Sequence, residues 1–160
     1  MGFQALAAAR AAEEGISFSE VVEIARKAKE HTGVMFVVDT LEYLHRGGRI
    51  GGASRLLGTA LNLKPLLYVN NGRVESLENN RTKGKALIRL LDLIEERISK
   101  GGPPVRIAAL HAACPEDGQQ LLDRATQRFH HTEAIFSVVG PVVGTHVGPG
   151  TVGIAYSTGI

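Results

Sequence analysis

Tryptophan is absent from this 160-residue chain, and phenylalanine and tyrosine together supply only eight side chains. So few rings argue against a module that binds nucleic acid by stacking on bases. The single cysteine, Cys114, excludes an internal disulfide and a cysteine-based zinc site, and it favours a reducing compartment. No apolar run approaches the roughly 20 residues of a membrane span, and residues 1–5 lack the basic and apolar regions of a secretory signal. We therefore expect a cytoplasmic protein.

The composition is that of an ordinary globular chain. Hydrophobic residues make up 44% and charged residues 21%, with a formal net charge of +2. This hydrophobic content excludes disorder, and a chain of this length buries roughly 70% of its unfolded surface without disulfides or structural metals. The weak positive charge leaves room for local contacts with phosphates or carboxylates.

Hydrophobic periodicity and turn signals predict a single α/β domain over residues 1–160 with a mixed sheet, flanked by helices. Residues 1–31 form leading helices, with a capping box at Ser17–Glu20, and Asn70-Asn71-Gly72 between alternating apolar runs predicts a β-hairpin. The glycine-dense segment 140–150 is predicted to be a loop. The expected helices are 2–14, 17–31, 41–46, 53–62, 82–99 and 116–130; the expected strands are 34–38, 65–69, 73–77, 105–111, 134–139 and 152–156.

Three basic or imidazole side chains stand out by their surroundings. His146 lies among glycines whose backbone N–H groups could meet the same anion or hydroxyl, although a plain surface histidine explains it equally well. Arg49 is flanked by glycine pairs ahead of a predicted helix, which suits a carboxylate or phosphate; a solvated arginine on a turn is the alternative. Arg81 opens a run of three cations at a helix N-terminus, where basic groups oppose the helix dipole, so that either an anionic partner or simple solvation explains the run.

Other motifs give no support for catalysis or cofactors. Residues 148–153 match G-x-G-x-x-G, but no strand precedes them and no helix follows, so we reject a dinucleotide site. Gly84-Lys85 lacks the remainder of a P-loop. No acidic residue is paired with a convincing nucleophile, and the histidines show no metal-ligand spacing. We expect no catalytic residue, no metal and no cofactor.

Four motifs in order resemble the DegV family of bacterial fatty-acid-binding proteins. They are Leu41–Ile50 (LEYLHRGGRI), Leu57-Gly58 with Leu61–Leu66 (LNLKPL), Arg81-Thr82-Lys83, and Gly144–Gly150 (GTHVGPG). The match runs over nearly the whole chain but covers only the C-terminal part of that family's two-domain protein. The first domain, which supplies the hydroxyl groups that clasp the carboxylate in the family, has no counterpart here.

The resemblance implies that the chain binds a long-chain fatty acid, with its tail in an aliphatic tunnel and its carboxylate near Arg49, His146 and Thr145. It also implies a carrier role, in which a separate ATP-binding fatty-acid kinase subunit phosphorylates the bound carboxylate and Arg81 contacts that partner or the phosphate. Burying about 15 methylenes is worth roughly 12 kcal/mol before entropy costs, so the tail should supply affinity and the head group orientation. The expected lining residues, each of which could also be plain core, are Ile50, Leu56, Leu57, Leu61 and Leu66.

Two other classes of function stay open. One is a small phosphotransfer or hydrolytic enzyme that uses His146 as nucleophile or base with Arg49 and Arg81 on phosphate. The other is an interaction or oligomerisation module, in which the face that the absent first domain would cover pairs with another copy.

Overall fold

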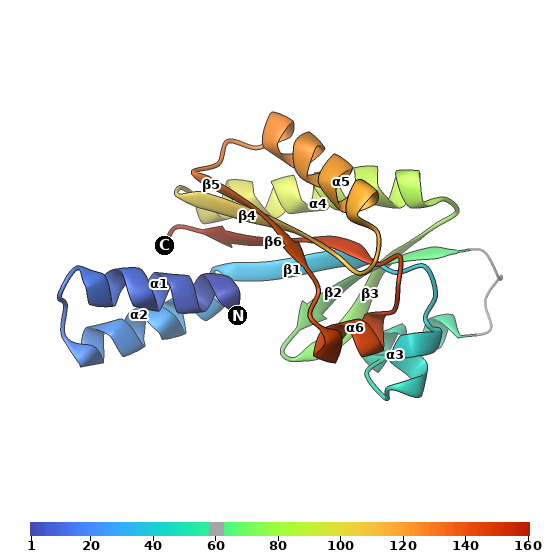
Figure 1. Ribbon diagram of the computed structural model, residues 1–160, viewed down its shortest axis with the longest axis horizontal. Helices are drawn as coiled ribbons and strands as arrows, with labels where there is room; N and C mark the ends of the chain where they lie inside the picture. Colours follow the sequence, from blue (N-terminus) through green and yellow to red (C-terminus); the bar gives the residue numbers. More distant parts are fainter. Residues whose placement is uncertain (58–62) are drawn as a thin grey trace.

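A six-stranded mixed sheet forms the centre of the computed structural model, which describes residues 1–57 and 63–160 (Figure 1). The strand order is β3-β2-β1-β6-β4-β5, with β4 and β5 parallel and the other neighbours antiparallel. The strands are β1 (Thr32–Val37), β2 (Lys64–Asn70), β3 (Arg73–Asn80), β4 (Val105–His111), β5 (Glu133–Val138) and β6 (Val152–Thr158). The last strand therefore lies in the middle of the sheet, between β1 and β4.

Helices cover both faces of this sheet. The long helices α4 and α5 pack on one face, while α3, the 3₁₀ helix η1 and α6 lie against one end of the other (Figure 1). The helices are α1 (Gly2–Glu13), α2 (Phe18–Glu30), α3 (Glu42–Arg46), η1 (Gly51–Leu56), α4 (Lys83–Gly101), α5 (Pro115–Arg128) and α6 (Pro141–Val147). None of the described helices is long and apolar enough to cross a membrane.

The leading helices α1 and α2 pack against each other beside the start of β1. Gln4 of α1 donates to the Thr32 hydroxyl of β1 at 2.9 Å, and Arg10 pairs with Glu133 of β5 at 2.9 Å. Arg106 of β4 shares the same Glu133 carboxylate at 3.3 Å. Polar contacts thus attach α1 to β1 and β5, and β4 joins them through the shared Glu133.

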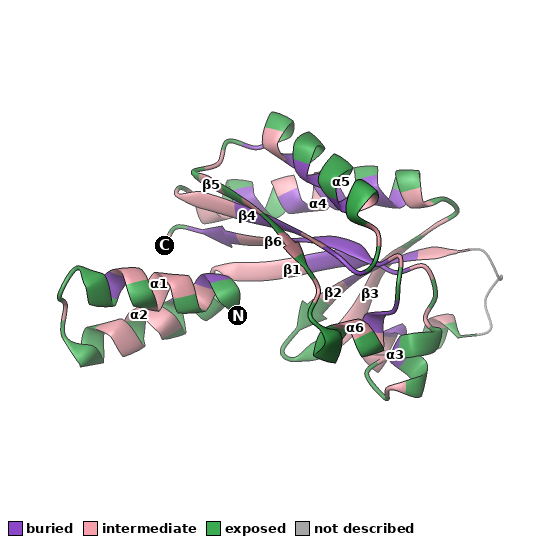
Figure 2. Cartoon of the chain, viewed as in Figure 1, coloured by how far each residue is buried: buried purple, intermediate pink, exposed green. Residues whose placement is uncertain are grey.

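The main core, which we call the α4-side cluster, lies between the sheet and helices α4 and α5 (Figure 2). Helix α4 presents apolar residues at intervals of three and four, the spacing that keeps them on one face. Those side chains meet the strand residues that point to the same face of the sheet. Among its members are Met35, Val37, Leu66, Leu90, Ile94, Ile107, Leu121, Val152 and Ile154.

A second apolar cluster, the α6-side cluster, occupies the opposite face beneath α3, η1 and α6. Its buried members are Phe36, Val38, Leu44, Ala53, Leu67, Ala112 and Val147. Neighbouring residues of a strand point to opposite faces, so Leu66 and Leu67 of β2 belong to different clusters.

Two local predictions are confirmed in detail. Asn71 and Gly72 adopt φ angles of 47° and 78° between β2 and β3, as the tight turn of a two-residue hairpin requires. At the start of α2, the Ser17 hydroxyl accepts from the Glu20 amide and the Glu20 carboxylate accepts from the Ser17 amide at 3.0 Å. This reciprocal pair is the expected capping box.

Two predicted elements differ from the structure. The expected helix 53–62 is instead a 3₁₀ helix at Gly51–Leu56, and its second half falls outside the described residues. The expected loop 140–150 contains helix α6, which begins at Pro141 and ends before Gly148 (φ 78°). Proline at the first helical position and glycine after the last position ordinarily mark the two ends of a helix. The high glycine content of the segment obscured both signals in the sequence.

Candidate functional site

Helix α3 brings Arg49 to the surface directly above the α6-side cluster. The Thr40 hydroxyl accepts from the Glu42 amide at 3.2 Å, and the helix ends where the Arg49 amide donates to Leu44 O at 2.9 Å. Leu44 is 1% exposed and fixes the helix to the cluster. The Arg49 guanidinium is exposed and donates to Gly47 O at 3.2 Å.

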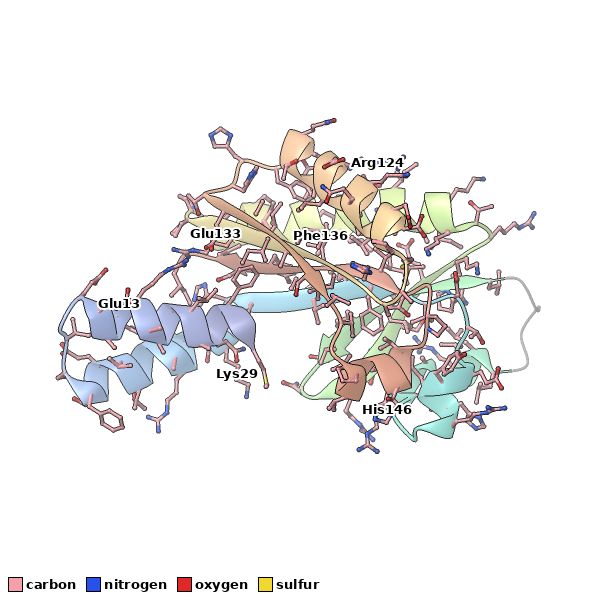
Figure 3. The ribbon with its side chains drawn as sticks, viewed as in Figure 1. Glu13, Lys29, Arg124, Glu133, Phe136 and His146 are labelled. Atoms are coloured by element: carbon pink, nitrogen blue, oxygen red, sulfur yellow. The ribbon has the colours of Figure 1, made fainter. Side chains whose placement is uncertain are left out.

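Helix α6 carries His146 to the same glycine. If Gly47 had a Cβ, that atom would lie 2.8 Å from His146 Cε1 and still closer to Nδ1, so the imidazole packs directly on the Gly47 backbone. His146 Nδ1 is buried and has no hydrogen-bond partner among the described residues. Figure 3 shows His146 on α6, beside α3. Arg49 and His146, far apart in the sequence, therefore both contact Gly47.

The packing of α3 on α6 is reciprocal. Each helix is followed by a glycine that receives a ring from the other: His146 of α6 lies on Gly47, and Tyr43 of α3 lies on Gly148. A Cβ at Gly148 would lie 2.7 Å from Tyr43 Cε2. Glycine is thus required at both positions for the close approach, and this contact sets the position of the imidazole.

The predicted lining residues divide between several environments. Ile50 packs against the α6-side cluster beside Arg49, whereas Leu66 is fully buried in the α4-side cluster, on the other face of the sheet from Ile50. Leu56 is half-buried at the end of η1, and Leu57 is 42% exposed. Leu61 lies outside the described residues.

The sequence analysis missed residues that the structure places next to Ile50. Phe36, Val38, Leu67 and Val147 all belong to the α6-side cluster. The period-two alternation of β2 could have identified Leu67 in place of Leu66, since alternate residues of a strand share a face. No comparable local signal connects Val147 to the strands.

Thr145 and Arg81 occupy different surroundings. The Thr145 hydroxyl donates to Pro141 O at 2.8 Å within α6, so its proton is already engaged. Arg81 is exposed at the junction of β3 and α4 and forms no hydrogen bond or ion pair with the residues that the structure describes. The structure does not bring Arg81 to Gly47.

Two ion pairs surround the loop that follows α6, and sequence reasoning missed both. Lys83 Nζ lies 2.5 Å from Asp117 Oδ2 and donates to Gly150 O at 2.7 Å. Lys64 Nζ pairs with Asp39 Oδ1 at 2.8 Å, and the Asp39 carboxylate packs on Gly150. The two pairs attach α4 and β2 to the loop.

Groups suited to metal binding are not assembled in the described ranges, 1–57 and 63–160. No three His, Cys, Asp or Glu side chains there could hold a metal ion. Burial raises the pKa of the Cys114 thiol, an effect that nearby Lys83 opposes, so the thiol stays protonated near neutral pH.

Comparisons with known proteins give a consistent result over the whole chain. The family described as "Uncharacterised protein, DegV family" matches residues 1–159. A DegV domain-containing protein of Streptomyces coelicolor is 46% identical over 159 residues, covering 99% of this chain and 56% of that protein. Protein DegV of Bacillus subtilis is 35% identical, covering 97% of this chain and 55% of its own length. The chain thus spans about half the length of the curated relatives it matches.

Solved structures share the same mixed sheet and flanking helices. A DegV family protein from Thermus thermophilus, described by its fatty acid binding, is 35% identical with a TM-score of 0.90 over 98% of this chain and 56% of its own. DegV of Bacillus subtilis, described as a fatty acid binding protein, is 34% identical with a TM-score of 0.84 over 99% of this chain and 56% of its own. By sequence and by fold, this chain belongs to the DegV family.

Proposed function

We propose that this chain binds one long-chain fatty acid, with the carboxylate at Arg49 and His146 and the alkyl tail against the α6-side cluster. The observation that carries the proposal is that Arg49 and His146 both contact Gly47, while Ile50, next to Arg49, packs against the α6-side cluster. A guanidinium suits a carboxylate because it is always charged and can donate two parallel hydrogen bonds. The fatty acid binding described for relatives from Thermus thermophilus and Bacillus subtilis supports the same ligand.

The tail enters by separating short elements from the sheet. Val38, Ala53 and Leu67 are fully buried in the α6-side cluster, so an alkyl chain must replace contacts that α3, η1 and α6 make with the strands. The free energy of tail burial, roughly 0.8 kcal/mol for each methylene, offsets the loss of these contacts. Leu66 takes no part, because it faces α4; Leu67 takes its place in the lining.

The test is the fatty-acid content of the purified chain, measured by mass spectrometry of an organic extract, with the Thermus thermophilus relative as positive control. We expect near-stoichiometric fatty acid in the unmodified chain and a reduced amount in Arg49→Gln. The matched control is Arg46→Gln, which removes an equal charge from a side chain that pairs with Glu42 at 2.6 Å. Absence of fatty acid from the folded chain, or equal losses in both variants, contradicts the proposal.

We further propose that the bound carboxylate is presented to an ATP-dependent kinase subunit and that Arg81 contacts this partner, the chain itself having no catalytic residue. Support comes from the exposure of Arg81 and from Lys83, two residues on, which holds the loop after α6. Arg81→Glu should abolish phosphorylation by the partner and leave lipid content unchanged, while Lys85→Glu, with the same charge change, should retain phosphorylation. Equal loss of lipid and phosphorylation in Arg81→Glu contradicts this role.

The enzymatic alternative has a separate test. Turnover of a phosphate or acyl ester without any partner, abolished by His146→Ala, would favour it over the carrier function. Pairing of two copies stays a prediction, which analytical ultracentrifugation of the chain with and without fatty acid will test.

A further inference from the structure

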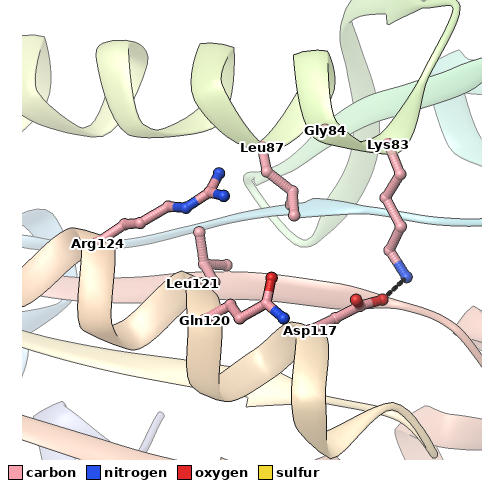
Figure 4. Close-up of a pocket in the computed structure, with 7 residues that line it drawn as sticks. All are labelled: Lys83, Gly84, Leu87, Asp117, Gln120, Leu121 and Arg124. Carbon is pink, nitrogen blue, oxygen red and sulfur yellow. Dashed lines mark hydrogen bonds and ion pairs between the residues drawn. The ribbon is translucent and has the colours of Figure 1, made fainter.

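A cavity of about 130 Å³ lies between α4 and α5, on the face of the sheet opposite His146 (Figures 3 and 4). A cavity admits one water molecule once its volume in this sense reaches about 10–15 Å³, so this one, which opens to solvent, has room for a group the size of a phosphate. Its floor is apolar, formed by Leu87 and Leu121, and its rim carries Lys83, Asp117, Gln120 and Arg124.

The charges at the rim leave one cation uncompensated. Lys83 and Asp117 neutralise each other at 2.5 Å. Arg124 extends from α5 toward α4 over the cavity (Figure 4) and forms no hydrogen bond or ion pair with any residue that the structure describes. The Gln120 amide, between them, is likewise without a partner in the described part of the chain. The cavity therefore offers a free guanidinium and a free amide to a ligand.

Two of the three other arginines on this pair of helices are paired, while Arg97 of α4, like Arg124, has no ion pair with a described residue. Arg89 pairs with Glu78 at 2.8 Å, and Arg128 pairs with Glu95 at 2.5 Å and with Asp92 at 2.7 Å. Arg124, four residues before Arg128 on the same helix, forms no such ion pair with a described carboxylate. An arginine that is left free at a hollow, beside neighbours that are paired, is placed for an external anion.

We propose that this cavity is a binding site for a phosphate-type oxyanion, separate from the fatty-acid site. The Arg124 guanidinium donates to two of the anion's oxygens, and the Gln120 amide donates to a third. Lys83, held in position by Asp117 and Gly150 O, adds positive charge at one end of the cavity. The opening toward solvent leaves space for either free phosphate or the phosphoryl group of a larger molecule.

The experiment is a titration of the ¹⁵N-labelled chain with inorganic phosphate, followed by ¹H–¹⁵N correlation spectra at constant ionic strength. We expect saturable shifts confined to residues 83–87 and 117–124. Arg124→Gln should weaken binding about tenfold, as the loss of a charge-assisted hydrogen bond predicts. The control Arg97→Gln removes an equal charge ten residues beyond Leu87, about 15 Å along α4, and should leave the affinity unchanged.

Three further arms make the result decisive. Chloride at equal ionic strength should not reproduce the shifts. The proposal is overturned if chloride does reproduce them, or if Arg124→Gln and Arg97→Gln weaken phosphate binding equally, because the cavity is then not a specific site. Glycerol 3-phosphate identifies the source: tighter binding than inorganic phosphate supports a phosphoryl group on a larger molecule, and equal or weaker binding supports the free anion. The fatty-acid content of Arg124→Gln should match the unmodified chain, which separates this proposal from the proposed function.

Discussion

The contact of His146 with Gly47 can be tested by adding one methyl group. In Gly47→Ala the new Cβ would lie 2.8 Å from His146 Cε1, closer than stable contacts allow, and at a tight 3.1 Å from Tyr43 O. The backbone itself tolerates alanine, because Gly47 has φ −78° and ψ −2°. Removing a glycine from the unfolded chain stabilises by about 0.4–1 kcal/mol, whereas overpacking costs about 1–3 kcal/mol. We expect a net destabilisation of about 1–2 kcal/mol.

The neighbouring Gly48 supplies the matched control. A Cβ there meets nothing within 4 Å, but the residue has φ 64°, a left-handed conformation that costs an alanine about 1–2 kcal/mol. Gly48→Ala should therefore lose similar stability without displacing His146. Both variants should melt about 2–8 °C lower, but only Gly47→Ala should shift the His146 imidazole resonances and reduce fatty-acid content.

A double-mutant cycle supplies the decisive result. In a His146→Ala background the imidazole is gone, so adding Gly47→Ala should be almost neutral, with a coupling energy of about 1–2 kcal/mol measured by denaturant unfolding. If Gly47→Ala costs as much free energy in that background as in the unmodified chain, the two residues are not in contact and the site as described is refuted.

Three other predictions follow from the packing and the titrating groups. Leu66→Ala should destabilise the chain by about 2–5 kcal/mol, measured by calorimetry, and leave the lipid content per folded chain normal. Leu67→Ala should also lower the lipid content, measured by mass spectrometry. Equal lipid loss in the two variants would contradict their placement on opposite faces of the sheet. Iodoacetamide should alkylate Cys114 slowly at pH 8 and rapidly in denaturant, because burial raises the pKa of its thiol; equal rates would refute this. Hydrogen bonds from Ser17 lower the pKa of Glu20. The melting temperature of the unmodified chain should therefore exceed that of Glu20→Gln above about pH 5, and the two should converge as the carboxylate is protonated in acid. A difference that persists at pH 2 would contradict the capping box.

The elements of this fold could be predicted where local chemistry determines them. Each of the six strands was predicted within a few residues, since apolar runs bounded by turn residues are distinctive. The hairpin at Asn71-Gly72 and the cap at Ser17 depend on contacts within four residues. Helix α6 was missed because Gly144 within it and the glycines that flank it lower helix propensity, and only packing against α3 overrides that preference.

The site was harder to predict than the fold. Nothing in the local pattern brings His146 to Arg49; resemblance to a family suggested it, and the reciprocal glycine contacts explain it. The separation of Leu66 from Ile50 could have been derived from strand alternation, which the clustering of leucines in the sequence obscured. The ion pair of Lys83 with Asp117 joins two helices and leaves no trace in either segment alone.

The interlocked glycines and rings of α3 and α6 have a consequence for how the protein moves. Helices of five and seven residues fall well below the roughly 12–15 residues at which an isolated helix becomes even marginally stable in water. Neither can persist once the other detaches, so the pair should behave as one cooperative foldon whose amides exchange with solvent at a common rate. A guest molecule could then reach the apolar interior through this small opening event while the six hydrogen-bonded strands stay closed.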